Sequence, residues 1–309
     1  MTSDKRDQRP IGVGVIGVGN FARQQHIPNL AAMPEARLTS LCDIDRDRLD
    51  EVGIEYGIAN RFTETDDLLT DPNTEVVVVT VRDDLQPSVS IRALEAGKHV
   101  YVEKPLSKSP DECLRVAEAV ARSDRRLAVG FNKRFAPIYQ AARGITTSTG
   151  TVSTLHLAMT DDAWRWAHGY RPGYLMTLDV CHHIDLIQWF TESPIASVYC
   201  QSSRPEDDVL LLTTETGAVA TVVFSGNDAM DTPKEYARLI GNRWSLTAED
   251  FVELFVHGLP EHPASYRFFG HIQHTGPMLH RRLMEKQGIS GWRSIRRIAW
   301  ELHHEEESA

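Results

Sequence analysis

Apolar residues in the first 130 positions form short runs, and most runs are followed by a stretch with helical spacing. The runs at residues 11–18, 37–42 and 75–81 are rich in Val, Ile and Leu, which is typical of strands buried on both faces. Further strands are expected at 99–102 and 127–129, and helices up to about residue 32 and at 45–56, 87–96 and 110–122. Strands that alternate with helices predict a doubly wound parallel sheet with right-handed crossovers.

The pattern changes near residue 150, where strand-like runs follow one another with little helix between them. Strands are expected at 151–159, 196–201, 209–214, 218–224 and 236–240, and one helix at 177–190. The Glu-Thr-Gly sequence at 215–217 predicts a hairpin turn. The sequence therefore predicts a flexible tail (1–10), a parallel α/β domain (11–130), and an α+β domain with a large, mostly antiparallel sheet (131–309).

Composition and charge exclude several classes of protein. Asp and Glu outnumber Lys and Arg by 43 to 33, whereas general nucleic-acid binding requires a basic surface. No apolar run approaches the roughly 18 residues of a membrane span, and residues 1–10 lack the pattern of a signal peptide. The 4 cysteines are scattered and the 13 histidines show no H-E-x-x-H pattern, so no disulfide framework or metal site is expected. We expect a cytoplasmic protein that binds neither nucleic acid nor membrane.

A glycine-rich turn joins the first strand to the first helix. Gly17, Gly19 and Ala22 fit the pattern G-x-G-x-x-G/A, with Asn20 and Phe21 inside it. Gly17 allows the tight turn, Gly19 lets the backbone approach a pyrophosphate, and Ala22 lets the helix pack closely on the sheet. The phosphates are expected at the N-terminus of the helix, where free N–H groups favour anions. The turn predicts that residues 11–130 form an NAD(P)-binding Rossmann domain.

An acidic residue at the end of the second strand strengthens this prediction. Asp43 stands where a carboxylate accepts hydrogen bonds from the adenosine ribose hydroxyls. The same charge repels a 2′-phosphate, which favours NAD, while the nearby Arg46 weakens that preference and leaves NADP possible.

A second candidate turn follows the strand at 99–102. Glu103, Lys104 and Pro105 lie at the carboxyl edge of the sheet, where ligands of such folds bind. Pro105 fixes the turn, so Lys104 is held there by rigid backbone. A lysine in a dry cleft exchanges a proton near neutral pH and stabilises a developing alkoxide.

The helix at 177–190 carries the other titratable groups. At 100° per residue, Asp179, His182 and His183 share one broad face. Asp179 is three residues before His182 and four before His183, so its carboxylate reaches either imidazole. A carboxylate that orients an imidazole is the geometry of a general base, and both histidines are candidates.

Several of these segments together resemble one family. The sequence A-G-K-H-V-Y-V-E-K-P-L at 96–106 is similar to a signature of the glucose–fructose oxidoreductase, inositol dehydrogenase and MocA family. The glycine turn, G-F-N-K-R-F at 130–135 and the helix at 177–190 match in order and spacing, over residues 11–240. The family pattern of a catalytic histidine three residues before an aspartate selects His182 with Asp185. A second register, with an aspartate four residues before the histidine, selects Asp179 with His183. We favour His182, because C-H-x-I-D-L matches at every position.

The resemblance implies a nicotinamide-dependent oxidoreductase that acts on a CH–OH group of a sugar, cyclitol or related polyol. It implies that Lys104 contacts both the cofactor and the substrate oxygen, and that Glu103 borders the cofactor. It also implies that Asn132 and Arg134 line the substrate cleft, although residues of these types at a strand end can equally organise the hinge between two domains. It also implies homo-oligomers, dimers or tetramers, through the second domain.

The segment before the helix is rich in aromatic and basic residues, among them Trp166. Such a loop either stacks on the substrate ring or simply covers the cleft. The expected reaction is removal of a hydroxyl proton by His182, oriented by Asp179, with hydride transfer to NAD. Two alternatives stay open: an enzyme that keeps NAD bound for epimerisation or glycoside cleavage, and a dinucleotide-binding regulator without turnover.

Overall fold

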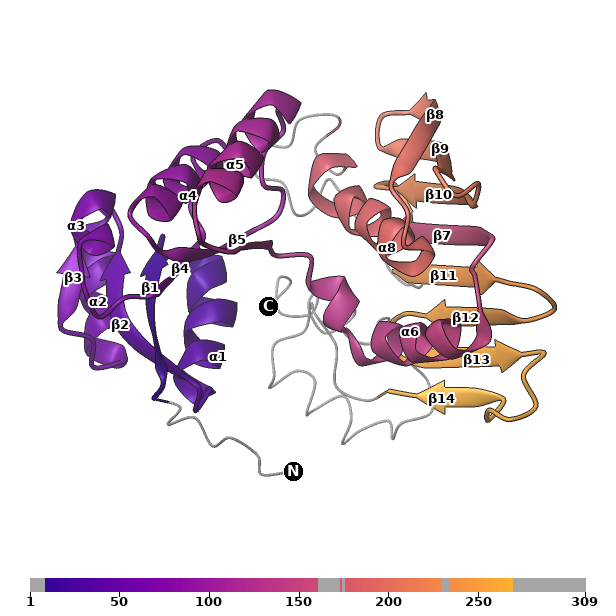
Figure 1. The fold of residues 1–309 in the computed structure, drawn as a ribbon, viewed down its shortest axis with the longest axis horizontal. Helices are drawn as coiled ribbons and strands as arrows, with labels where there is room; N and C mark the ends of the chain where they lie inside the picture. Colours follow the sequence, from indigo (N-terminus) through magenta and orange to yellow (C-terminus); the bar gives the residue numbers. More distant parts are fainter. Residues whose placement is uncertain (1–8, 161–172, 174–175, 229–233, 269–309) are drawn as a thin grey trace, which may run out of the picture. The chain divides into compact units, whose positions relative to one another are not determined.

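The computed structural model describes residues 9–160, 173, 176–228 and 234–268 of the 309-residue chain (Figure 1). The chain divides between Phe131 and Asn132 into two compact units. The loop with Trp166 lies outside the described residues. Within the described part, no helix has the length and apolar character that crossing a bilayer requires.

The first unit contains a six-stranded parallel sheet. Its strands lie in the order β3-β2-β1-β4-β5-β6, which is the strand order of a Rossmann fold. The order reverses between β1 and β4, and the carboxyl ends of the strands at such a point form the usual binding edge. The strand bounds are β1 Ile11–Ile16, β2 Ala36–Cys42, β3 Asn60–Phe62, β4 Val76–Val79, β5 His99–Val102 and β6 Leu127–Val129.

Helices cover both faces of this sheet. Val78 of β4 packs in one core, with residues from the first helix and α2, while Val77 and Val79 pack in the other, with residues from α3, α4 and α5. Burial on both faces explains why β4 is a continuous run of valines rather than an alternating pattern. The helical bounds are η1 Ala22–His26, which is a π-helical turn, α1 Ile27–Ala32, α2 Arg46–Glu55, α3 Thr65–Leu69, α4 Gln86–Glu95 and α5 Pro110–Arg122.

The second unit contains an eight-stranded sheet in the order β14-β13-β12-β11-β7-β10-β9-β8. Among the described strands of this sheet, β7 and β10 form the one parallel pair, and the other neighbours are antiparallel. The strand bounds are β7 Thr154–Thr160, β8 Ile195–Arg204, β9 Asp207–Thr214, β10 Val219–Ser225, β11 Glu235–Ile240, β12 Ser245–Glu249, β13 Glu253–His257 and β14 Ser265–Arg267.

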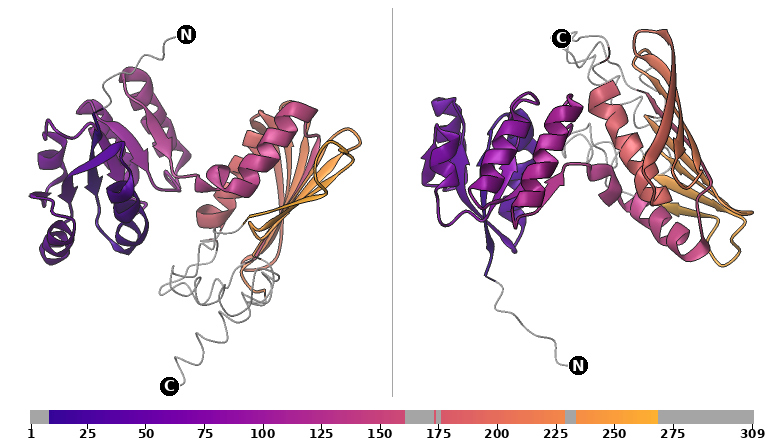
Figure 2. Two further views of the ribbon diagram at one scale, coloured as in Figure 1. Left: turned by 90° about the horizontal axis from the view of Figure 1, so that it is seen from below. Right: turned by 45° about the horizontal axis from the view of Figure 1, so that its top comes forward.

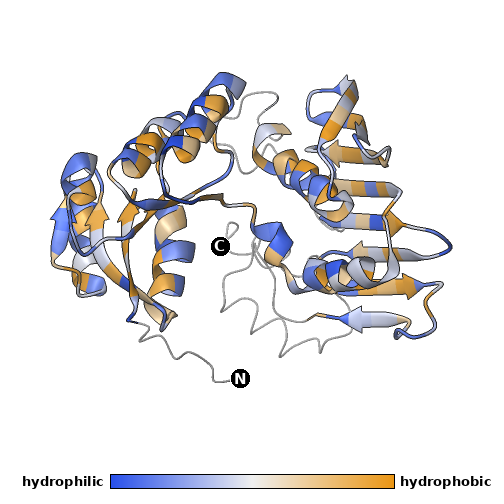
Figure 3. Cartoon of the chain, in the orientation of Figure 1, coloured by the Kyte–Doolittle hydropathy of each residue, from blue (hydrophilic) through white to orange (hydrophobic). Residues whose placement is uncertain are grey.

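Two long helices pack on one face of this sheet (Figure 2). They are α6 Pro137–Thr149 and α8 Cys181–Thr191; a 3₁₀ turn, η2 Asn132–Phe135, precedes α6, and a π-helical turn, η3 Met176–Val180, precedes α8. Apolar residues, coloured orange in Figure 3, occur along the strands and along the helices that pack on them. Among the described helices of this unit, none covers the opposite face, on which Tyr199, Leu211 and Val223 are exposed.

The two predicted sheets are confirmed, and β5, β6 and α5 have the expected bounds. Three strands at the end of the second sheet, β12 to β14, and helix α6 were not predicted. The predicted helix over 177–190 is confirmed as η3 and α8, but the chain is π-helical up to Val180, so the regular 100° spacing assumed for its first residues was wrong. In a π-helix each N–H bonds to the carbonyl five residues back, so the 100° spacing does not extend back to Asp179.

Candidate active site

The glycine-rich turn begins directly after β1. Gly17 has a φ of 93°, and a Cβ at this position would lie 2.7 Å from the carbonyl oxygen of Thr80. The Gly17 N–H donates to the Cys42 carbonyl at 2.8 Å, which ties the turn to the end of β2. Both the backbone conformation and the close approach of the neighbouring strand therefore require glycine here.

The next residues of the turn have more space around them. A Cβ on Gly19 would meet no atom within 4 Å, and Asn20 and Phe21 are exposed. Ala22, by contrast, is buried in the core beneath the sheet. The packing of this unit therefore does not itself require glycine at position 19, while it explains the small residue at position 22.

Asp43 joins the end of β2 to the glycine turn. Its Oδ2 accepts a hydrogen bond from the Val18 N–H at 2.7 Å, and its Oδ1 accepts one from the Asp45 N–H at 2.9 Å. A carboxylate offers about four acceptor positions, so two remain for further donors. Asp43 thus holds the glycine turn in shape and keeps acceptor capacity at the binding edge of the sheet.

The arginine near Asp43 is Arg48 rather than Arg46. Arg46 is mostly exposed and its Nε donates to Asp50 Oδ2 at 3.1 Å. Arg48 lies 3.8 Å from the Asp43 carboxylate and 3.0 Å from Asp45. Asp45 caps α2 by accepting from the Arg48 N–H. The N-cap rule predicts the bond between Asp45 and the Arg48 N–H, but not the position of the Arg48 guanidinium beside Asp43.

The E-K-P turn is held by its glutamate. Glu103 Oε1 lies 2.8 Å from His26 Nε2, and Oε2 accepts from the Lys104 N–H at 3.2 Å. Burial and the nearby Glu103 carboxylate, which also forms a hydrogen bond with Tyr101, raise the pKa of Tyr101 to about 12. The bond between Lys104 and Pro105 is cis. Sequence reasoning had not identified His26 or Tyr101 as part of this turn.

The first half of the A-G-K-H-V signature is structural. Gly97 follows α4 with a φ of 77°, the left-handed conformation that commonly ends a helix. The Lys98 ammonium donates to the carbonyls of Asp71 at 2.8 Å and Thr74 at 2.7 Å. Lys98 therefore ties the turn before β4 to the start of β5, while the chemical candidates stand in the second half of the signature.

In the second unit, Arg134 binds α8 with both arms of its guanidinium. Its Nε and Nη2 donate to the two carboxylate oxygens of Asp185 at 2.6 and 2.5 Å. Asp185 is buried, so this bidentate pair fixes η2 to the turn of α8 that carries His182. Asn132, at the start of η2, is exposed.

The two adjacent histidines of α8 have different surroundings. His183 has no exposed surface, and its Nε2 lies 3.0 Å from Glu235 Oε1. The Lys133 ammonium bonds to the same carboxylate. Burial, followed by the charge of Lys133, lowers the pKa of His183. His182 retains 4 % exposure, and Asp179 stands three residues before it in η3, where its charge also acts on His183. Lys133 and Glu235 were not singled out from the sequence.

Lys104 belongs to the first unit, and His182 and Asp179 belong to the second. Their convergence on one ligand therefore stays a prediction. Among the described residues, no group of three or more His, Cys, Asp or Glu side chains is arranged to hold a metal ion.

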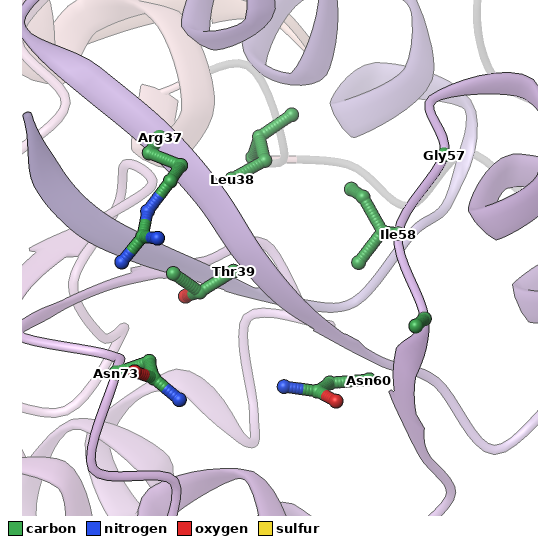
Figure 4. Close-up of a pocket in the computed structure, with 8 residues that line it drawn as sticks. Arg37, Leu38, Thr39, Gly57, Ile58, Asn60 and Asn73 are labelled. Carbon is green, nitrogen blue, oxygen red and sulfur yellow. The ribbon is translucent and has the colours of Figure 1, made fainter.

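A hollow of about 250 Å³ lies beside the first half of β2 (Figure 4). It is bordered by Arg37, Leu38, Thr39, Gly57, Ile58, Ala59, Asn60 and Asn73. Asp43 and the glycine turn follow the other end of β2, so this hollow is separate from the predicted dinucleotide site.

Comparison with known proteins identifies both units. The sequence profile of an oxidoreductase family with an NAD-binding Rossmann fold matches residues 11–131, and that of the GFO/IDH/MocA C-terminal domain matches residues 145–247. The chain is 25 % identical to the uncharacterised oxidoreductase YrbE of Bacillus subtilis, over 78 % of this chain and 74 % of that protein. It is 30 % identical to inositol 2-dehydrogenase 1 of Saccharopolyspora erythraea, over 69 % and 66 %.

Solved structures share the fold. Scyllo-inositol dehydrogenase from Lactobacillus casei, with bound NAD(H) and scyllo-inositol, superposes with a TM-score of 0.70 at 22 % identity, over 78 % of this chain and 76 % of that one. The WlbA dehydrogenase from Bordetella pertussis, in complex with NADH and UDP-GlcNAcA, gives 0.72 at 19 % identity, over 82 % and 79 %.

Proposed function

Because the chain belongs to the Gfo/Idh/MocA family of NAD-binding oxidoreductases, we propose that it is a dehydrogenase acting on a CH–OH group of a sugar, cyclitol or related polyol. The observation that carries this proposal is the first unit's combination of an open glycine turn, a carboxylate bound to that turn, and a lysine on the next binding-edge turn. Inositol dehydrogenases among the relatives support the substrate class.

The residues of the first unit fit a dinucleotide. The backbone at Gly19 has open space in front of it, as a pyrophosphate requires, and Asp43 keeps acceptor positions for ribose hydroxyls. The negative charge of Asp43 favours NAD, since it repels a 2′-phosphate. Arg48, at 3.8 Å, partly offsets that charge and makes NADP a weaker second cofactor.

Bound nicotinamide supplies the hydride acceptor, and the chain supplies the proton transfer. In this proposal His182 accepts the hydroxyl proton, Asp179 orients the imidazole, and the Lys104 ammonium stabilises the negative charge that develops on the oxygen. Asn132 borders the substrate in this proposal. Arg134 acts indirectly, because its guanidinium binds Asp185 and holds that turn of α8 in place.

His182 is the better candidate for the base. His183 has no exposed surface and already contacts Glu235, so neither ring nitrogen is available to a substrate. The Arg134–Asp185 pair also fits the family register in which the histidine stands three residues before the aspartate.

The test is turnover with NAD and NADP on a panel of inositols and sugars, followed by absorbance of the reduced cofactor. We expect His182→Asn to lower kcat by about 10²-fold or more, with NADH affinity nearly unchanged. Lys104→Ala should lower kcat by a similar factor and also weaken NADH binding, since Lys104 contacts the cofactor in this proposal. His183→Asn is the matched comparison, and a larger loss of kcat with it than with His182→Asn reverses the assignment. Product formation without net NADH would instead identify an enzyme that returns the hydride to its product.

The uncovered face of the second sheet supports a homo-oligomer. Tyr199, Leu211 and Val223 stand on it with 63 %, 44 % and 37 % of their surfaces exposed, and Val209 and Val219 lie beside them. A second copy of the chain is the proposed occupant. Leu211→Glu is expected to shift the mass measured by light scattering toward the monomer, and an unchanged mass would rule out this face.

A further inference from the structure

His26 links the glycine turn to the E-K-P turn. It is the last residue of the π-helical turn η1, and its Nε2 lies 2.8 Å from Glu103 Oε1, although 77 positions separate the two residues. Both side chains are largely buried, with 17 % and 13 % of their surfaces exposed. An ionised carboxylate only accepts hydrogen bonds, so Nε2 is the protonated nitrogen of the ring.

The Glu103 carboxylate contacts both His26 and the backbone of Lys104. One carboxylate oxygen accepts from His26, and the other accepts from the Lys104 N–H at 3.2 Å. Tyr101 forms a further hydrogen bond with the carboxylate. The Glu103 N–H donates to the Val79 carbonyl at 3.0 Å, which anchors the start of the turn to the sheet. A single carboxylate thereby fixes the backbone from which the Lys104 side chain extends.

The neighbouring strand leaves room for this cluster. A Cβ on Gly130, directly after β6, would lie 2.9 Å from the Tyr101 hydroxyl and 3.1 Å from Glu103 Oε1. The backbone of Gly130 is not left-handed, so space rather than conformation is what favours glycine here. The glycine that opens G-F-N-K-R-F therefore belongs to the same arrangement as the E-K-P turn.

Aromatic rings hold the imidazole from two sides. The ring of Phe21, within the glycine turn, lies 5.3 Å from the His26 ring, and the ring of Tyr101 lies 5.4 Å from it, both edge to face. Contacts thus run without a break from Phe21 through His26 and Glu103 to the backbone of Lys104.

We propose that His26 is a positioning residue for Lys104, and that it couples occupation of the glycine turn to the orientation of the lysine amine. This inference rests on the proposed dehydrogenase function. A ligand on the glycine turn restrains Phe21 and the first helix, and the His26–Glu103 bond carries that restraint to the E-K-P turn. His26 itself touches neither the substrate nor the reacting carbon in this proposal.

The variants for the test are His26→Leu, which removes the hydrogen bond, and His26→Gln, whose amide nitrogen reaches nearly the position of Nε2. Arg23→Ala is the matched control on the same helical turn, because Arg23 pairs with Glu51 on the surface. We expect His26→Leu to lower kcat by about 10-fold to 10²-fold, the scale of a small displacement of a catalytic group, with NADH affinity nearly unchanged. His26→Gln should recover most of the loss, and Arg23→Ala should match the wild type.

A second readout does not depend on turnover. The rate at which an amine-specific reagent labels Lys104 is measured by peptide mass spectrometry, with and without saturating NAD. NAD should change this rate in the wild type and in His26→Gln, but much less in His26→Leu, although all three bind NADH. Equal NAD-dependent changes in His26→Leu and the wild type would overturn the coupling. Loss of kcat in proportion to NADH affinity would show that His26 serves binding only. Absence of turnover on every polyol in the wild type rejects the proposed function instead, and the labelling result still decides the role of His26.

Discussion

Each unit of the chain contains a histidine paired with a glutamate, and the two pairs have different surroundings. In the first unit His26 and Glu103 are 2.8 Å apart and keep 17 % and 13 % of their side-chain surface exposed. In the second unit His183 and Glu235 are 3.0 Å apart, with 0 % and 1 % exposed. The first, called the open pair here, joins the glycine turn to the E-K-P turn and is partly exposed. The second, the sealed pair, joins α8 to β11 and is fully buried.

The sealed pair is joined by a third buried group, the ammonium of Lys133. Lys133 binds the Glu235 carboxylate, so one positive and one negative group are buried together. Burial opposes ionisation of Glu235, but the Lys133 charge and the contact with His183 outweigh it and bring the pKa down to about 2. A change in the sealed pair should therefore affect mainly folding, whereas a change in the open pair should affect mainly the chemistry of Lys104.

The largest change in stability is expected when the sealed pair is broken. Glu235→Ala leaves the Lys133 ammonium buried without a counter-charge, which typically costs about 3–5 kcal/mol. Urea unfolding followed by tryptophan fluorescence measures this unit selectively, because all 6 tryptophans lie after residue 131. Glu192→Gln is the control, since Glu192 pairs with Arg143 at the surface and exposed pairs contribute little. A similar small loss for both variants would contradict the comparison.

The second largest effect is expected from acid, which should lower the free energy of unfolding of the second unit. Both His183 and Glu235 have lowered pKa values in the folded chain, so the unfolded chain binds more protons as the pH falls. Stability should begin to fall below about pH 6.5 through His183, and fall further from about pH 4.5 to 2 through Glu235. The lowering of the Glu235 pKa from 4.5 to about 2 accounts for about 3 kcal/mol of this loss, since one pKa unit corresponds to 1.36 kcal/mol.

The measurement is the free energy of unfolding from urea titrations at a series of pH values. His183→Gln should flatten the curve between pH 6.5 and 5, because that variant has no imidazole to protonate. A curve with the same slope in both proteins would mean that His183 does not contribute to the acid response.

The open pair should give a smaller change in stability and a larger change in rate. In Glu103→Gln an amide N–H₂ faces a donor, either His26 or the Lys104 N–H, so we expect a loss of about 1–2 kcal/mol in the first unit. Thermal unfolding followed by circular dichroism and kcat on the best polyol are measured together. A stability loss as large as that of Glu235→Ala would remove the distinction between the two pairs.

The smallest effects are expected at the exposed arginines near the predicted ribose site. Arg46→Ala should leave both stability and the choice of cofactor unchanged, because Arg46 is mostly exposed and pairs with Asp50 on α2. Arg48→Ala should increase the preference for NAD over NADP by a few-fold, since Arg48 lies closer to Asp43. The measurement is the ratio of kcat/KM with NAD to kcat/KM with NADP for each variant. A change in this ratio for Arg46→Ala alone would show that Arg46, as expected from the sequence, is the arginine that weakens the preference for NAD.

The sequence predicts local features of this fold well and long-range contacts poorly. The Gly17 turn, Gly97 at the end of α4 and the bounds of α5 follow from neighbouring residues alone. Lys133 and Glu235 are 102 positions apart, and nothing near either residue indicates the other. Strand β12 contains Ser245, Thr247 and Glu249, and its identity as a strand depends on pairing with β11 and β13 rather than on its own apolar pattern.

The parallel pair β7–β10 sets the order in which the second unit can be completed during synthesis. Residues 154–160 and 181–191 leave the ribosome before residues 219–225, yet Leu157, Leu186 and Val222 belong to one core. Helix α8 can therefore complete its packing only after β10 has been translated. Until then β7 lacks its parallel neighbour. In a chain released before residue 219, the helix with the two adjacent histidines would lack the strand β10 against which it packs.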